Sequence, residues 1–281
     1  MIYVSSSCVR TKSLKEAIET LALNGITSIE LSGGTSYDKN LTKKLIQLKD
    51  KYSLALMAHN YFPPPKEDFV LNLASLNDDI FDKSMEHYKR AIDLSEKVGA
   101  TTFGMHAGFY INIATDQLGK RIKKSELFNK INAKERFCKA FEELKSFARG
   151  IDLYIENNVF SSANYQEYPN SNPFMLTSYE EYIELKQVLD FNLLLDVAHL
   201  KVSSSTLGLN FEEELLNMSK ESDYWHLSDN NTLADENRGF GEKLLNNLQK
   251  LPTRPKKVTI EVYEDIETVV NSYTKIQKVL F

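Results

Sequence analysis

Six short apolar segments of the sequence each end in a side chain that could bind a metal ion or carry a proton. These residues are His59 (SLALMAHN), His106 (GMHAGF), Glu156 (IDLYIENN), Asp196 (LLLDVAHL), His226 (SDYWHLSDN) and Glu261 (KVTIEVYED). Apolar runs of this length are typical of buried parallel strands, which deliver polar groups at their C-terminal ends. The run at 193–200 is the most informative, because three leucines lead into Asp196 and His199 follows three positions later.

Four of these residues form an oxygen-rich ligand set of three carboxylates and one imidazole: Glu156, Asp196, His226 and Glu261. Such a set suits Mn²⁺, Mg²⁺ or Co²⁺ and also accepts Zn²⁺. His59 and His106 could join Glu156 around a second metal ion. A single acid or histidine at a strand end is more often a satisfied polar residue than a ligand. However, four of the five histidines lie at such ends or just beyond one. The fifth, His87 in MEHYKR, is expected on a helix surface.

The elements that must position these residues alternate between strand and helix along the whole chain. Strands are predicted at 2–7, 27–34, 53–60, 101–108, 151–158, 193–200, 223–230 and 257–263. Helices are predicted at 13–25, 37–52, 79–98, 133–150, 178–190, 211–221, 244–251 and 265–281. Ser13 and Ser178 are expected N-caps, each with a glutamate three residues later. Eight such β/α units with no linker between them predict one α/β domain over residues 1–281, a (β/α)₈ TIM barrel. A doubly wound open sheet is the alternative, but no Gly-rich phosphate-binding turn follows any strand.

In such a barrel the active site lies at the C-terminal ends of the strands. The four proposed ligands end predicted strands five to eight, which are neighbours around the ring, so we expect them to converge. His199 is expected to bind a substrate oxygen or to orient Asp196. Arg238 is a candidate clamp for a carboxylate or phosphate, with a solvated loop arginine as the alternative. Aromatic residues near the strand ends could stack on a sugar, form a lid or make an oligomer contact, so a homo-oligomer stays open.

Composition narrows the class of protein. The net charge is −5 and the pI is about 5.7, which gives no electrostatic footprint for nucleic acid. The two cysteines do not suggest a disulfide framework, so a reducing compartment is expected. The sequence shows no segment of signal-peptide character and no apolar run of membrane-spanning length. We therefore expect a soluble cytoplasmic protein.

Seven short motifs, taken in order, resemble the xylose-isomerase-like barrels: IELSGG, HNYF, MHAG, IENN, LDVAH, HLSDN and IEVY. The resemblance spans about residues 2–263, and that superfamily includes sugar and sugar-phosphate isomerases and epimerases as well as the endonuclease IV group. In the ketose epimerase branch, the residues matching Glu156, Asp196, His226 and Glu261 bind one metal ion. The resemblance also implies that Glu156 and Glu261 act as the acid/base pair.

Several residues of this chain also resemble the metal ligands of the endonuclease IV branch. The resemblance to that group covers its first two zinc sites and one ligand of its third, through His59, His106, Glu156, Asp196, His199, His226 and Glu261. The third site should be completed by an Asp-x-His pair after His226. The loop here, NNTLADENRGFGE, contains no histidine, and Asp235 falls where that histidine is expected. The resemblance therefore does not imply a complete trinuclear site.

The favoured hypothesis is a divalent-metal-dependent isomerase or epimerase of carbohydrate metabolism. It would move a proton through a metal-stabilised ene-diolate of a sugar or sugar derivative. The expected substrate-binding residues are His59, His106, His199 and Arg238. One alternative is an endonuclease IV-like zinc phosphodiester hydrolase that acts on DNA. Another is a non-catalytic barrel that binds a small ligand.

Overall fold

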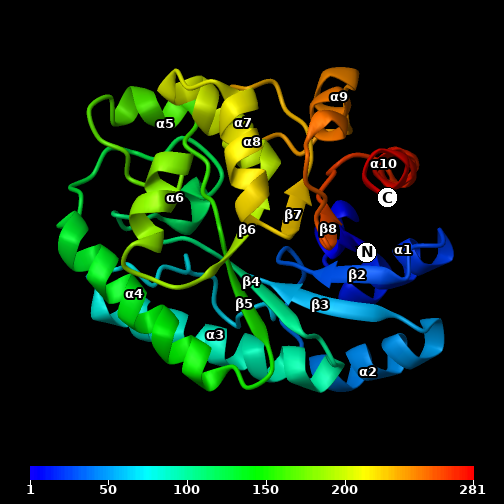
Figure 1. Ribbon diagram of the computed structural model, residues 1–281. Helices are drawn as coiled ribbons and strands as arrows, with labels where there is room; N and C mark the ends of the chain where they lie inside the picture. The colour runs from blue at the N-terminus through cyan, green and yellow to red at the C-terminus, as the bar shows by residue number, and fades with distance from the viewer.

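Eight parallel strands close into a barrel in strict chain order (Figure 1). The computed structural model describes residues 1–281, and its strands are β1 (Ile2–Ser5), β2 (Ser28–Leu31), β3 (Ala55–His59), β4 (Thr102–His106), β5 (Asp152–Glu156), β6 (Asn192–Asp196), β7 (Tyr224–Leu227) and β8 (Lys257–Ile260). β1 pairs with both β2 and β8, so the sheet has no free edge. The predicted TIM barrel is confirmed.

Ten α-helices surround or cap the barrel: α1 (Leu14–Leu23), α2 (Leu41–Tyr52), α3 (Asp78–Val98), α4 (Lys130–Phe147), α5 (Ser162–Glu167), α6 (Tyr179–Lys186), α7 (Val197–Leu207), α8 (Phe211–Glu221), α9 (Glu242–Lys250) and α10 (Ile266–Leu280). Two short 3₁₀ helices, η1 (Ser6–Cys8) and η2 (Thr115–Gln117), lie in loops. Figure 1 shows α2, α3 and α4 along the outside of β3, β4 and β5. None of the helices combines the length and the apolar character that crossing a membrane requires.

Helix starts follow the capping rules read from the sequence. Ser13 Oγ accepts the backbone N–H of Glu16 at 3.3 Å, and Ser178 Oγ accepts that of Glu181 at 3.3 Å. These bonds satisfy amide groups that have no partner inside the helix. Both predicted N-caps are confirmed.

Only the first half of the stretch 193–200 is a strand, so the prediction of one strand over all eight residues was wrong. β6 ends at Asp196, and α7 begins at the next residue. Asp196 is the N-cap of α7, because its Oδ1 accepts the backbone N–H of His199 at 2.7 Å. His199 therefore lies in the first helical turn, and the predicted helix 211–221 corresponds to α8, the second helix of this unit.

His87 is fully buried, which contradicts its expected place on a helix surface. It lies on the face of α3 that packs inward, together with Ser84, Tyr88 and Ala91. Its Nε2–H donates to the backbone oxygen of Asn60 at 3.1 Å. Asn60 directly follows β3 and has a positive φ of 34°, so His87 supports the turn that comes after His59.

The long loops beyond β3, β4 and β5 form a second, small hydrophobic cluster above the barrel. Its members are Val70, Phe109, Ile111, Ile122, Phe160, Tyr168 and Phe174. Asn72 ties two of these loops together, because its side-chain amide donates to the backbone oxygens of Phe109 (2.9 Å) and Ile111 (3.3 Å). The loops are thus packed segments that shape one side of the barrel mouth.

Candidate metal centre

The strand register brings the predicted ligands together at the C-terminal end of the barrel. His106 on β4 pairs in register with Glu156 on β5, and Asp196 on β6 pairs with His226 on β7. Glu261 follows β8 by one residue, and its backbone N–H donates to Leu227 at 3.0 Å. Adjacent residues on parallel strands point to the same side of the sheet. Side chains that are far apart in the sequence therefore share one small volume.

Glu156 is the carboxylate to which three histidines converge. Its Oε2 accepts from His59 Nε2 at 2.7 Å and lies 3.2 Å from His106 Nδ1. Its Oε1 lies 3.4 Å from His226 Nδ1. Burial by itself raises the pKa of this carboxyl group, but His106, His59 and His226 together hold the pKa well below its ordinary value. Glu156 is thus an ionised carboxylate surrounded by imidazoles.

Three overlapping groups of side chains have ligand atoms within 4.8 Å of one another. They are Glu30, His59, His226 and Glu261; His59, His106 and Glu156; and Glu156, Asp196 and His199. The second group is the one predicted around a second metal ion. The predicted four-ligand set is divided between the first and third groups, and Glu156 connects its two halves through the contact with His226.

The chemistry of these atoms fits a divalent cation. Within the three groups, four buried side-chain atoms form no hydrogen bond: Glu30 Oε1, His106 Nδ1, Glu156 Oε1 and His226 Nδ1. Buried polar atoms almost always have a hydrogen-bond partner, so unpaired atoms gathered in one place need a reason. Imidazole nitrogens and carboxylate oxygens are the ligands of Zn²⁺, Mn²⁺ and Co²⁺ sites in proteins.

His199 belongs to the other side of the centre, facing Asp235. Its Nδ1–H donates to the backbone oxygen of Asn157 at 2.8 Å, which leaves Nε2 to face Asp235 Oδ2 at 3.4 Å. Burial lowers the pKa of His199, but Asp196 and Asp235 raise it well above its ordinary value. Burial also raises the pKa of Asp196 to about 7. His199 orients Asp196 through its backbone N–H, while its ring contacts Asp235.

The loop after β7 brings Asp235 and Asn237 to the cavity. In Asp235-Glu236-Asn237, the aspartate itself contacts His199, and Asn237 lines the same cavity two residues later. Neither Asp235 nor Asn237 supplies an imidazole to a third metal site. A neutral amide is a weaker metal ligand than an imidazole.

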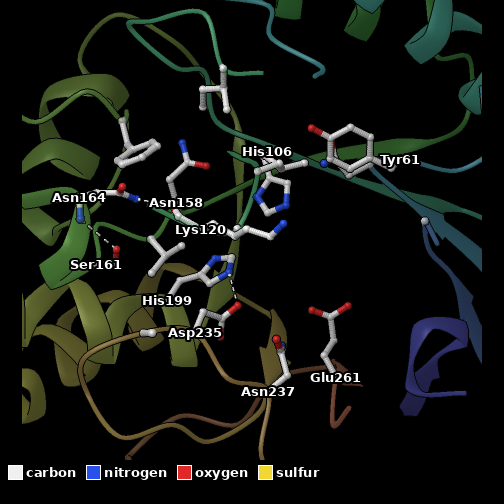
Figure 2. Close-up of a pocket in the computed structure, with 18 of the residues that line it drawn as sticks. Tyr61, His106, Lys120, Asn158, Ser161, Asn164, His199, Asp235, Asn237 and Glu261 are labelled. Atoms are coloured by element: carbon white, nitrogen blue, oxygen red, sulfur yellow. Dashed lines mark hydrogen bonds and ion pairs between the residues drawn. The ribbon is translucent and has the colours of Figure 1, made fainter. Parts of the chain in front are cut away.

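A cavity of about 620 Å³ opens above these residues (Figure 2). His59, His106, His199 and Glu261 line it. Glu156, Asp196 and His226 are absent from its lining and are at most 2 % exposed, so they lie beneath its floor. Of the two predicted acid/base residues, Glu261 thus faces the cavity directly.

Arg238 does not line the cavity. Its guanidinium pairs with Glu236 Oε1 at 2.6 Å, and just over half of its side chain is exposed. The sequence prediction that Arg238 binds substrate stays a prediction, and this position does not favour it. Lys120 is a cation that does line the cavity (Figure 2), and its Nζ donates to the backbone oxygen of Asp116 at 3.1 Å.

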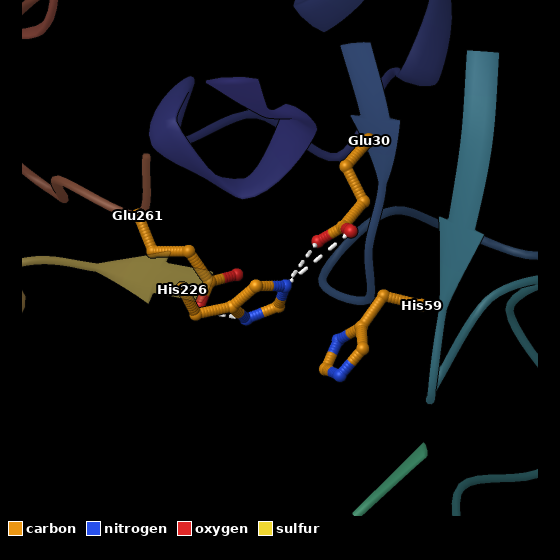
Figure 3. Close-up of side chains that lie close together, drawn as sticks. All are labelled: Glu30, His59, His226 and Glu261. Atoms are coloured by element: carbon orange, nitrogen blue, oxygen red, sulfur yellow. Dashed lines mark hydrogen bonds and ion pairs between the residues drawn. The ribbon is translucent and has the colours of Figure 1, made fainter. Parts of the chain in front are cut away.

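Glu30 was missed as a site residue in the sequence. It lies on β2 with no exposed surface, and it faces His226 inside the barrel (Figure 3). The motif IELSGG contains it between Ile29 and Leu31, so an acid inside an apolar run was the available signal.

A comparison with protein-family models places residues 18–251 in the xylose isomerase-like TIM barrel family. The chain belongs to that family. The match covers most of the barrel, including every strand end that contributes to the centre except that of β8. A search of curated proteins found no match.

Solved structures with the same fold include both enzyme branches. A D-tagatose 3-epimerase-like protein aligns with a TM-score of 0.72 and 19 % identity, covering 99 % of this chain and 96 % of the other. D-psicose 3-epimerase from Clostridium cellulolyticum, solved with D-tagatose, gives 0.65 and 14 %, with 99 % of each chain covered. Endonuclease IV from Thermus thermophilus gives 0.61 and 13 %, also with 99 % of each covered. At these identities the similarity establishes the fold.

Proposed function

We propose that this protein is a divalent-metal-dependent isomerase or epimerase of a ketose or a ketose derivative. The observation that carries the proposal is the position of Glu261, a buried carboxylate that contacts His226 from one side and lines the cavity from the other. The similarity in fold to a D-tagatose 3-epimerase-like protein and to D-psicose 3-epimerase supports this substrate class.

The reaction needs a base beside a weakly acidic C–H next to a carbonyl group, and a second group that returns the proton. We assign these roles to Glu261 and Glu156, whose carboxylates both lie 3.4 Å from His226 Nδ1. Glu261 would exchange a proton with substrate in the cavity. Glu156 would need the imidazoles of His59 and His106 to move aside, or to relay the proton, because it lies beneath the floor.

Glu156, Asp196, His226 and Glu261 would hold the metal ion, which when bound supplies Lewis-acid stabilisation of negative charge on substrate oxygens. His199 and His106 line the cavity and would hydrogen-bond substrate hydroxyl groups. The packed loops at the mouth would limit access of water to the ene-diolate that forms after C–H cleavage.

A zinc phosphodiester hydrolase is the second candidate, and one observation favours it. His59, His106 and Glu156 form a compact group beside the first set, as a two-metal centre would require. Against it, the loop after His226 contains no histidine where the endonuclease IV resemblance implies one. We therefore rank this activity second.

The test is proton exchange at carbon. The metal-loaded protein is incubated with D-tagatose, D-psicose or D-fructose in D₂O, and deuterium incorporation and epimer formation are followed by NMR. The proposal predicts both, with loss of both after chelation. No incorporation with any ketose, together with cleavage of abasic DNA, would establish the hydrolase instead.

A further inference from the structure

The proposed reaction leaves one carboxylate inside the barrel unused. Glu30 has no solvent exposure, and three side chains from β7 and β8 contact its carboxylate. Tyr224 Oη donates to Oε2, and Thr259 Oγ1 lies 3.2 Å from the same oxygen. His226 Nε2 lies 3.1 Å from Oε1 and 3.3 Å from Oε2. An ionised carboxylate that is buried without hydrogen-bond or charged partners destabilises the fold, so these contacts are needed to stabilise Glu30 inside the barrel.

The two nitrogens of His226 face different partners. Nε2 points to Glu30, whereas Nδ1 lies 3.4 Å from both Glu156 Oε1 and Glu261 Oε2. Figure 3 shows Glu30 and Glu261 at opposite edges of the imidazole ring. The lone pairs of the two ring nitrogens diverge in the ring plane, so one metal ion cannot bind both. An ion shared by Nδ1, Glu156 and Glu261 leaves Nε2 to carry the proton.

We propose that Glu30 is a positioning residue that accepts the Nε2–H of His226 and thereby presents Nδ1 to the metal ion. This inference rests on the metal centre of the proposed function. A carboxylate behind a ligating histidine fixes the tautomer and the ring orientation and makes the imidazole a better ligand. The competing role for Glu30 is direct ligation, since it also belongs to a group with His59, His226 and Glu261.

Hydrogen bonding favours the positioning role. Oε2 of Glu30 already accepts from Tyr224, with Thr259 beside it, and Oε1 faces Nε2 of His226. Oε2 also receives the hydrogen bond of His226 Nε2 at 3.3 Å, so donors of the protein already occupy this oxygen, while Oε1 lies 3.1 Å from the same nitrogen without a hydrogen bond. The two nitrogens of His226 differ in the same sense: Nε2 is hydrogen-bonded to Glu30 Oε2, whereas Nδ1 forms no hydrogen bond and faces the unpaired Oε1 of Glu156, as two ligands of one ion do.

The first test measures metal affinity by competition with a chelator, using Zn²⁺ or Mn²⁺ alone. Glu30→Gln removes the charge and keeps the size of the side chain. We expect the same number of ions per chain at saturation and a Kd about 10–100-fold higher. Thr259→Val is the matched control, because it removes a partner of Glu30 Oε2 but leaves the carboxylate and the contacts of His226 in place. Its Kd should rise much less than that of Glu30→Gln.

Cobalt substitution separates positioning from ligation. The absorption spectrum of Co²⁺-loaded Glu30→Gln should keep the wild-type coordination pattern, whereas Glu261→Gln should change it. A Kd for Glu30→Gln within twofold of wild type would overturn the proposal. So would a lost ion, or a Co²⁺ spectrum altered in the same way as that of Glu261→Gln.

A measurement on the wild-type chain covers the case in which Glu30→Gln does not fold. Histidine ¹⁵N shifts of the Zn²⁺-loaded protein report which nitrogen of His226 carries the proton, and the chain has only five histidines to assign. We expect a protonated Nε2 and a metal-bound Nδ1. The reverse assignment would refute the proposal. None of these three readouts uses turnover, so a metal-binding protein without epimerase activity would refute the proposed function and leave this inference standing.

Discussion

The burial of His87 in α3 predicts how the free energy of unfolding depends on pH in the acid range. Burial, together with a smaller contribution from Arg90, lowers the pKa of His87 from its ordinary 6.5 to about 4, although its bond to the Asn60 carbonyl raises it. Between about pH 4 and 6.5 the unfolded chain binds a proton at this residue while the folded chain does not. The stability contributed by neutral His87 is therefore complete above about pH 6.5 and is lost as the pH falls toward 4.

The magnitude follows from the two pKa values. One pKa unit corresponds to about 1.4 kcal/mol, so about 3 kcal/mol of unfolding free energy is coupled to this proton. About 1.4 kcal/mol of it should be lost by pH 5.5. His87→Gln keeps an N–H donor near the Asn60 carbonyl and cannot titrate.

The assay is urea unfolding of both proteins at pH 7.5, 6.5, 5.5 and 4.5. The free energy of wild type minus that of His87→Gln should fall by about 1.4 kcal/mol between pH 7.5 and 5.5 and continue to fall below that. Glu86→Gln, on the exposed side of the same turn, is the control and should keep the wild-type pH dependence. A difference between wild type and His87→Gln that does not change with pH would refute the assigned pKa and its cause.

Three further predictions concern the site. Glu156→Gln and Glu261→Gln should each reduce turnover by more than the roughly 10²–10⁴-fold of acid–base catalysis alone, because each is proposed as both ligand and proton carrier; activity within tenfold of wild type would remove that residue from the mechanism. Arg238→Ala should leave KM within about twofold, since exposed charges paired like Arg238 and Glu236 contribute little, and a large rise in KM with unchanged kcat would restore the anion clamp. Gly104→Ala would place a Cβ 2.7 Å from Leu194 Cδ1 and 2.8 Å from His59 Cδ2, so thermal unfolding should show a loss of about 1–3 kcal/mol; unchanged stability would contradict the packing described.

Much of the fold and the site could be predicted from the sequence, because all parallel strands of a barrel end at the same face. Apolar runs that end in His106, Glu156 or His226 specify both a strand and its polar tip, and chain order then makes the tips neighbours. α7 was missed because its residues, Val197 to Leu207, include β-branched and serine residues that favour helices weakly. The helix begins after its N-cap, Asp196, and the apolar residues before Asp196 favoured a continuous strand over a capped helix.

The sequence analysis missed the site role of Glu30 and the burial of His87, each for a reason of its own. Strands of a parallel barrel are buried on both faces, so alternation does not reveal which face of β2 looks into the barrel and which looks toward the helices. The side of α3 that carries His87 was more accessible to prediction, because Ser84, His87 and Ala91 recur at helical spacing. Histidine is intermediate between buried and exposed residue types, so its identity alone did not decide the matter.

The most direct test of the account is the metal content per chain, by element, of wild type and of the His59→Ala/His106→Ala double variant. One ion held by Glu156, Asp196, His226 and Glu261 is sufficient for the isomerase or epimerase. The account therefore predicts about one divalent ion per chain in the double variant as in wild type. Two or more zinc ions per wild-type chain that fall to about one in the double variant, with cleavage of abasic DNA by the wild type alone, would contradict it.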